Sequence, residues 1–278
     1  MSEVEASTAT IMPPPRPKKW TGARIAGLAV MVFWAAAGVG LVWYLIDAFS
    51  IKFYERYAWK FLHGFWITIK IVGISLIIGA VLSVPLTFAR LSSHKVISKL
   101  AFGYSYLFRG TPLLAQTYLV YYGFGAFSEE LKSVGLWWFF RDATSCIIFI
   151  FSLNTAAYQA EILRGSIENV PNTQTEAGRA LGLSTFAIYY KIIIPQALIT
   201  ALRPYGNEII LMIKGSAIAS LVTVFDLMGE TRRAFSRSFD FQTYIWAALL
   251  YLSVVEALRN VWSRLETRLT RHLERESE

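Results

Sequence analysis

The stretch IVGISLIIGAVLSVPLTFA, residues 71–89, contains no charged side chain. A helix of this length rises about 28 Å, close to the hydrocarbon thickness of a bilayer. Three further runs are also free of charge, at residues 25–46, 110–128 and 143–160. Only 17% of the 278 residues are charged, whereas soluble domains carry about 25%. Four such runs in one chain exclude a soluble fold and indicate an integral membrane protein.

Six membrane-spanning helices account for the apolar runs, so the predicted fold class is all-α. The run at 25–46 follows a basic cluster but exceeds a signal-peptide core of about 7–15 residues, so we expect an uncleaved first helix. Pro204 and several polar residues predict that the fifth span is interrupted and lines a cavity. The expected spans are residues 24–46, 63–89, 97–127, 143–163, 192–225 and 241–262.

The two ends of the chain differ from the spans in composition. Residues 1–23 begin with a polar, proline-rich stretch and are predicted to form a disordered cytoplasmic tail. Residues 263–278 continue a helical pattern of Leu between charges, which predicts a cytoplasmic amphipathic extension. This extension either lies on the membrane surface, contacts a partner, or is a solvated helix end.

The distribution of basic residues predicts that both termini lie in the cytoplasm. In that orientation the cytoplasmic segments carry 15 Lys and Arg residues and the opposite loops carry 8. Cytoplasmic loops retain an excess of these residues. Basic residues that flank the spans therefore account for the net charge of +8. No nucleic-acid partner is expected.

Several kinds of chemistry lack the residues that they need. The single cysteine, Cys146, excludes an internal disulfide and a cysteine-rich metal site. His63, His94 and His272 lie far apart in the sequence, so no metal site and no cofactor are expected. No phosphate-cradling G-x-x-x-x-G-K-[ST] motif and no nucleophile–base constellation is present, so ATP would have to be hydrolysed by a separate subunit.

The most informative loop is the one at residues 164–191, between the fourth and fifth expected spans. It contains TEAGRALGLS, residues 175–184, a short helical pattern that Gly182 should end. Glu176, close to the expected helix start, would suit the helix dipole. A second short helix is expected at 185–191. Ala177 and Gly178 would allow close approach, so the loop suits docking into a groove of another protein.

The run E-A-G-x-x-x-G, nine residues and then I-x-I-P resembles the EAA loop of ABC importer permeases. The usual form is E-A-A-x-x-x-G-x9-I-x-L-P, so Gly178 and Ile194 depart from it but keep the size class. The resemblance implies a coupling helix seated in a groove of a cytoplasmic ATPase subunit. The implied coupling residues are Glu176, Ala177, Gly178, Gly182, Leu183 and Pro195.

Further segments resemble polar amino acid permeases, above all those for histidine, lysine/arginine/ornithine and opines. They include FRGTPL at 108–113, the residues from Asn154 to Gly165, and the residues from Asn207 to Leu227. The resemblance covers residues 63–262 and implies a type I importer with a five-helix core, to which the helix at 24–46 is an addition. It also implies an inner-membrane location, an ATPase dimer, a second, paralogous permease, a periplasmic binding protein and a basic amino acid or opine as cargo.

Polar residues at membrane depth are candidates for the substrate pathway because they are costly there. Asn154 and Tyr158 either line a pathway or join helices by hydrogen bonds. Glu208 either contacts a cationic ligand or pairs with Lys214 or Arg203. Glu161 and Arg164 are expected to anchor the loop. The full set of pathway candidates is Gln116, Asn154, Tyr158, Asn207, Glu208 and Lys214.

Three other functions remain possible for an apolar chain of this kind. A secondary transporter driven by an ion gradient would need no ATPase. A membrane enzyme would need a catalytic cluster at membrane depth, and none is visible. An exporter or scaffold would not depend on a soluble binding protein.

Overall fold

The computed structural model describes residues 21–48 and 50–274, with side chains as far as Thr270. The chain forms two units, Met1–Ser50 and Ile51–Glu278. The described part of the first unit is helix α1 (Gly22–Asp47), whose side chains are not buried. The expected tail at 1–23 lies almost wholly outside the described residues.

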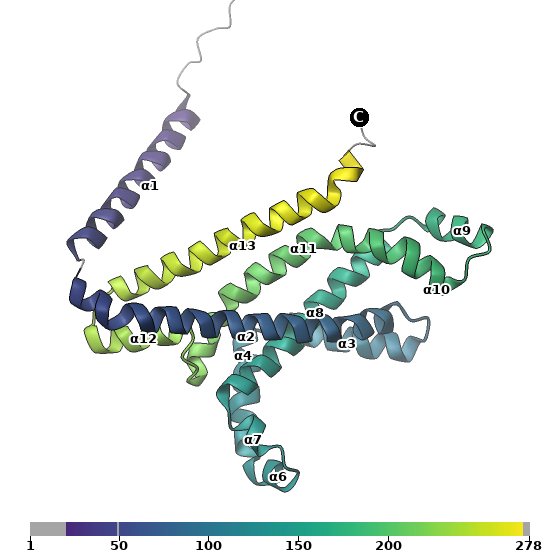
Figure 1. Cartoon of the computed structure of the whole chain (residues 1–278), viewed down its shortest axis with the longest axis horizontal. Helices are drawn as coiled ribbons and strands as arrows, with labels where there is room; N and C mark the ends of the chain where they lie inside the picture. Colours follow the sequence, from purple (N-terminus) through teal and green to yellow (C-terminus); the bar gives the residue numbers. More distant parts are fainter. Residues whose placement is uncertain (1–20, 49, 275–278) are drawn as a thin grey trace, which may run out of the picture. The chain divides into compact units, whose positions relative to one another are not determined.

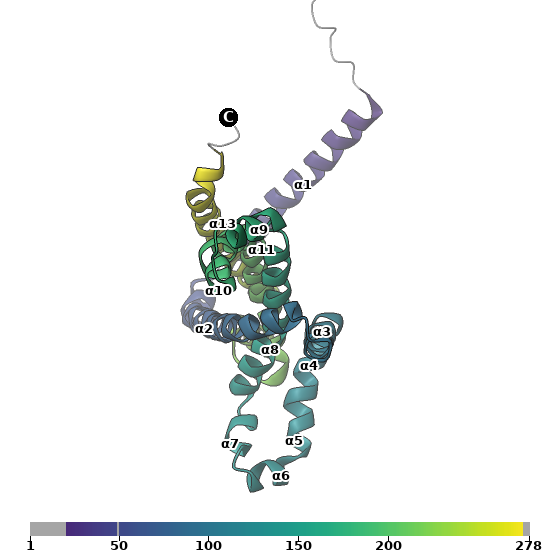
Figure 2. The same cartoon turned by 90° about the vertical axis from the view of Figure 1, so that its right-hand side faces the viewer.

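The second unit is built from helices, and no strand occurs in its described residues. In Figures 1 and 2, the segment from α5 to α7 projects away from the other helices of this unit. The elements are α2 (Ile51–Leu91), α3 (Lys95–Gly110), α4 (Leu113–Tyr118), the π-helical turn η1 (Leu119–Gly123), α5 (Phe124–Ala126), α6 (Ser128–Ser133), α7 (Trp137–Phe140), α8 (Ala143–Glu168), α9 (Asn172–Ala180), α10 (Thr185–Ile188), the π-helical turn η2 (Tyr189–Ile193), α11 (Ile194–Gly215), the 3-10 helix η3 (Ser216–Val222), α12 (Leu227–Ser238) and α13 (Gln242–Glu274).

Helix α8 is the centre of the second unit and packs against α2, α3 and α11. Its buried residues combine large side chains, such as Ile147 and Phe151, with a run of small ones, Ala156 and Ala157. The small residues allow neighbouring helices to approach closely, which is how helices associate where lipid removes the hydrophobic drive. This crossing brings the polar residues of α8 against α2 and α11.

Gly79 marks the closest approach of α2 to α8. A Cβ atom at this position would collide with Thr155 Cγ2, and it would lie 3.3 Å from the backbone nitrogen of Ala156. Thr155 is β-branched and fully buried, so it cannot easily move aside. The contact explains why a residue without a side chain stands here.

Gly79→Ala is therefore expected to destabilise the protein by about 1–3 kcal/mol, the usual cost of overpacking. The measurement is the thermal unfolding temperature in detergent. Gly73→Ala is the matched control, because it lies in the same helix and a Cβ atom there meets nothing within 4 Å. Equal unfolding temperatures for the two variants would contradict the packing argument.

The third expected span is wrong as a single helix. Residues 97–127 are divided between α3 and the short elements α4, η1 and α5. The break falls at Thr111, whose backbone is extended with φ −114° and ψ 146°. Pro112 causes this, because proline disfavours a helical conformation in the residue before it and has no N–H to donate.

In the described residues, five helices are long and apolar enough to cross a membrane: 22–47, 51–91, 143–168, 185–222 and 242–270. Two predicted spans are shorter than the helices that contain them: α2 begins at Ile51 instead of residue 63, and α8 continues to Glu168. Helix α13 runs without a break through Glu274 and includes the helical pattern expected after residue 262. The fifth span is continuously helical across Pro204, and its irregular turns lie at its two ends.

Candidate functional site

The loop between α8 and α11 folds as a helical hairpin, formed by α9, α10 and η2 (residues 172–193). Helix α9 begins at Asn172, directly after Pro171, whose extended backbone stands at the helix start. Pro171 and Asn172 form a turn and helix-start signal in the sequence, and the helix begins at that signal. Glu176 lies in the second turn, beyond the reach of the dipole effect that the sequence suggested.

Gly182 turns the chain between the two short helices. Its φ of +73° lies in the left-handed region, which glycine adopts without strain. The amide of Gly182 donates to Arg179 O at 2.9 Å, and the amide of Leu183 donates to Gly178 O at 3.0 Å. The Ser184 side chain then accepts from the Ala187 amide at 3.2 Å and begins α10. These bonds fix the hairpin turn from residue 178 to residue 187.

Gly178 is the buried residue of α9. A Cβ atom there would lie 2.8 Å from Ile188 Cγ1, and Ile188 itself is buried. Gly178 therefore faces α10, and its small size serves the packing of the hairpin on itself. Glu176 and Ala177 are exposed on the same helix.

Pro195 explains the irregular turn that joins the hairpin to α11. Because proline has no N–H, it cannot donate to a carbonyl one turn back. The chain forms the π-helical turn η2 immediately before it. The Gln196 side chain donates to Ile192 O at 2.9 Å and so satisfies a nearby carbonyl.

The outer surface of the hairpin carries large apolar side chains. Leu181 and Phe186 are 79% and 77% exposed, and Tyr190 stacks parallel to Phe186 at 5.9 Å between ring centres. Exposed apolar residues beside charged ones are typical of a protein interface. The hairpin therefore offers a docking face around Glu176.

A cluster of charges stands at the base of this hairpin. Glu161 accepts from Arg90 Nε at 2.8 Å and from Arg164 Nε at 2.9 Å, and its side chain is only 12% exposed. Arg109 Nη1 lies 3.8 Å from the same carboxylate. Arg164 also pairs with Glu168. One carboxylate therefore joins the last turns of α2 and α3 to α8, close to where α8 leads into the hairpin.

Glu208 of α11 is buried against α8. Its Oε1 accepts from Thr155 Oγ1 at 2.8 Å, and Gln159 Nε2 donates to the same hydroxyl at 3.1 Å. The expected alternative, pairing with Arg203 or Lys214, is wrong: Arg203 pairs with Glu266 at 3.0 Å. Lys214 is exposed, and no described basic side chain forms an ion pair with Glu208.

Gln116 and Asn154 bond to the end of α3 and to each other. Gln116 Nε2 donates to Phe108 O at 2.8 Å, and Asn154 Nδ2 donates to the same carbonyl at 2.9 Å. Asn154 also donates to Gln116 Oε1 at 3.0 Å. Tyr158, one turn further along α8, donates to Arg109 O at 3.5 Å. These side chains occupy carbonyls that the break before Pro112 leaves without helical partners.

The other two pathway candidates do not join either group. Asn207 and Lys214 are exposed, and no hydrogen bond or ion pair to another described residue is found for them. The candidates selected from the sequence include neither Thr155 nor Arg90. The signal for Thr155 was its spacing of four residues from Gln159, which places both on one helix face.

Comparisons with known proteins identify the family to which this chain belongs. Residues 75–271 match the model of the family described as the inner membrane component of binding-protein-dependent transport systems. The chain belongs to this family. This permease is therefore a multi-pass inner-membrane subunit of an ABC transport system, and the ATPase is a separate subunit.

Curated relatives are similar to this chain in sequence along most of their own length. The permease is 41% identical over 207 residues to the nopaline transport system permease protein NocM of Agrobacterium fabrum, covering 74% of this chain and 86% of that protein. It is 38% identical over 211 residues to the histidine/lysine/arginine/ornithine permease protein HisM of Escherichia coli K12, covering 76% and 89%. The predicted polar amino acid family is confirmed.

Solved structures confirm the predicted type I permease fold. A crystal structure of an amino acid ABC transporter with histidines matches with a TM-score of 0.70 at 31% identity, covering 80% of this chain and 99% of that one. An inward-facing MetNI methionine transporter shares the fold, with a TM-score of 0.65 at 17% identity and coverage of 78% and 99%. The family implies an ATPase partner and a substrate-binding protein.

Proposed function

We propose that this permease carries a basic amino acid or an opine across the inner membrane, past the Glu208 carboxylate. The main support for this proposal is the environment of Glu208. This residue is 7% exposed, and its carboxylate accepts from the Thr155 hydroxyl but has no described cation within ion-pair distance. A buried carboxylate without a cation is costly at membrane depth. A cationic cargo would supply the missing charge. The relatives include nopaline, octopine and histidine/lysine/arginine/ornithine permeases, which supports this cargo class.

The proposed complex contains two ATPase copies, a second, paralogous permease and a periplasmic binding protein. The ATPase would dock on the hairpin at residues 176–183, with Glu176, Ala177 and Leu183 exposed to it. Gly178, Gly182 and Pro195 would act by shaping the hairpin. In this arrangement the hairpin and both termini lie in the cytoplasm, as the distribution of basic residues predicts.

Gln116, Asn154 and Tyr158 are proposed to hold the wall of the pathway at the break between α3 and α4. Asn207 and Lys214 are free to face the second permease or the cargo. Thr155 and Gln159 would orient the Glu208 carboxylate, because both stand in one hydrogen-bonded chain with it.

Glu208→Gln is expected to lower uptake of a cationic cargo about 30-fold or more in proteoliposomes that contain the whole complex. Removing one partner of a buried charge pair costs at least about 2 kcal/mol. Glu208→Asp keeps the charge and should retain more activity. Substrate-stimulated ATP hydrolysis measures the same step independently.

The matched control is Glu129→Gln, because Glu129 pairs with Lys132 on the exposed helix α6. It should leave uptake unchanged. Undiminished uptake of lysine, arginine and opines by a correctly assembled Glu208→Gln complex would contradict the proposed role.

A further inference from the structure

A pocket of about 620 Å³ lies at the end of α2 remote from Glu161, beside the C-terminal end of α12. Tyr57 forms a buried part of its wall. The lining residues are Lys52, Phe53, Glu55, Arg56, Tyr57 and Ser238.

Helix α12 is held firmly against α2, so the pocket is a fixed part of the fold. The Leu227 amide donates to Thr68 Oγ1 at 3.1 Å. A Cβ atom at Gly64 would lie 2.8 Å from Asp226 O, which shows how closely the backbones approach. Tyr57 and Leu227 belong to one buried apolar cluster.

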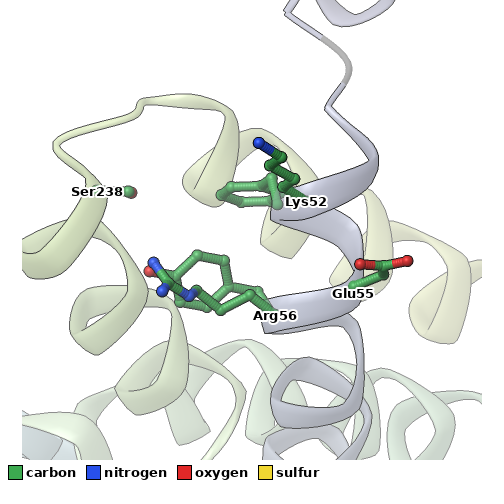
Figure 3. A pocket seen from close by; sticks show the side chains of 6 residues that line it. Lys52, Glu55, Arg56 and Ser238 are labelled. Atoms are coloured by element: carbon green, nitrogen blue, oxygen red, sulfur yellow. The ribbon is translucent and has the colours of Figure 1, made fainter.

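Both cations of the pocket lie on the side of α2 that faces Ser238. Figure 3 shows the Lys52 and Arg56 side chains on this side, whereas the Glu55 carboxylate points to the other side of the helix. Lys52 and Arg56 are exposed, and neither forms an ion pair with a described residue. The two cations outnumber the one carboxylate of the lining, so the pocket has a net positive charge and an aromatic wall.

The expected position of the pocket relative to the membrane favours a lipid over a soluble partner. Trp59, 75% exposed, follows Arg56 by three residues, about 4.5 Å along the helix axis. Exposed tryptophans and other aromatics settle at the headgroup level, and the headgroup layer is about 5–8 Å thick on each side. On α12's side the chain continues with Phe239 and Phe241, both largely exposed. From this spacing we expect Arg56 to lie within the headgroup layer.

We infer that this pocket binds the phosphate of an anionic phospholipid headgroup, held by Lys52 and Arg56. The shared chemistry is that of any phosphate anion, and the aromatic rim at membrane depth selects the lipid. The bound lipid bridges α2 and α12 at the end of the bundle opposite the ATPase-docking hairpin. The site does not depend on which cargo is carried.

The test uses the full chain in its assembled complex, with phosphatidylglycerol as the probe and native mass spectrometry as the readout. Replacing both Lys52 and Arg56 with alanine should weaken retention of phosphatidylglycerol about 30-fold, at roughly fivefold per basic residue. Lys95→Ala with Lys99→Ala is the matched control, since these exposed lysines have the same spacing on α3. Ser238→Phe fills the pocket, keeps both cations and should also reduce retention.

Three outcomes would overturn the inference. Equal retention by the pocket variant and the control would mean that the lipid is held only by general attraction to basic residues. Displacement of phosphatidylglycerol by millimolar inorganic phosphate would mean that the pocket selects the free anion. Unchanged lipid retention together with weaker binding of the periplasmic protein would assign the surface to that protein.

Discussion

Replacing Glu176 with lysine is expected to leave the permease folded and inserted in the membrane but unable to retain its ATPase. Glu176 is exposed on α9, in the middle of the proposed docking face, so the substitution should not disturb the packing of the hairpin. Reversing a charge at an interface costs several kcal/mol, which corresponds to association at least about 100-fold weaker. Co-purification of the ATPase and ATP-dependent uptake measure the two consequences.

The control for this variant is Glu129→Lys, a charge reversal on the exposed helix α6. It should leave both co-purification and uptake intact. If Glu176→Lys retained its ATPase and its transport activity, the hairpin could not be the docking element.

Replacing Glu161 with alanine is expected to separate docking from coupling. The Glu161 carboxylate is bound by Arg90 and Arg164 and has Arg109 nearby. Its removal leaves mutually repelling cations, and breaking a largely buried pair costs about 3 kcal/mol of the free energy of unfolding. Because the hairpin face itself is unchanged, the ATPase should still bind. Movement of the hairpin should no longer be transmitted to α2 and α3, so substrate should cease to stimulate ATP hydrolysis.

A double-mutant cycle separates this role from a general loss of stability. Arg90→Ala combined with Glu161→Ala should be less destabilising than the sum of the two single variants, since the pair is already broken in each. Glu256→Ala is a control, because Glu256 pairs with Arg259 in a more exposed position on α13. Additive effects of Arg90→Ala and Glu161→Ala, with substrate stimulation preserved, would rule out the positioning role.

Much of the fold could be predicted from the sequence because the hydrocarbon core of a bilayer permits few backbone structures. Uncharged runs of about 20 residues must form helices in a bilayer, so α1, α8 and the central parts of α2, α11 and α13 could be located. Gly182 predicted the turn of the hairpin, since few other residues adopt its left-handed backbone conformation. The family resemblance supplied the ATPase and the docking loop, and the family match confirms the permease assignment.

Other features depend on contacts that a single sequence does not reveal. The extra turns of α2 before residue 63 carry charged residues, yet they remain helical because Tyr57 and Phe61 pack against Leu227. The joining of Arg90 to Glu161 spans 71 residues of sequence. The break at Thr111 is different: Pro112 was a sufficient signal, but the uncharged run through 110–128 outweighed it in the prediction.

The competing functions make distinct demands on the chain. A secondary transporter would not belong to a family defined by binding-protein-dependent transport, so the family match decides against that reading. A membrane enzyme would need convergent catalytic groups. The buried polar groups around Glu208 and Gln116 instead bond to hydroxyls and to backbone carbonyls. An exporter or scaffold would work without the soluble protein for which the family is named.

The side of the membrane on which the hairpin lies can be measured by labelling a cysteine placed on it. Ala177→Cys introduces an exposed thiol, while the only native cysteine, Cys146, is 1% exposed. A membrane-impermeant maleimide should label the new thiol in inside-out vesicles, and bound ATPase should block the reaction. Glu129→Cys, on the opposite side, should react in intact spheroplasts. Labelling of Ala177→Cys from outside intact spheroplasts would contradict the assignment of the hairpin as the ATPase-docking element.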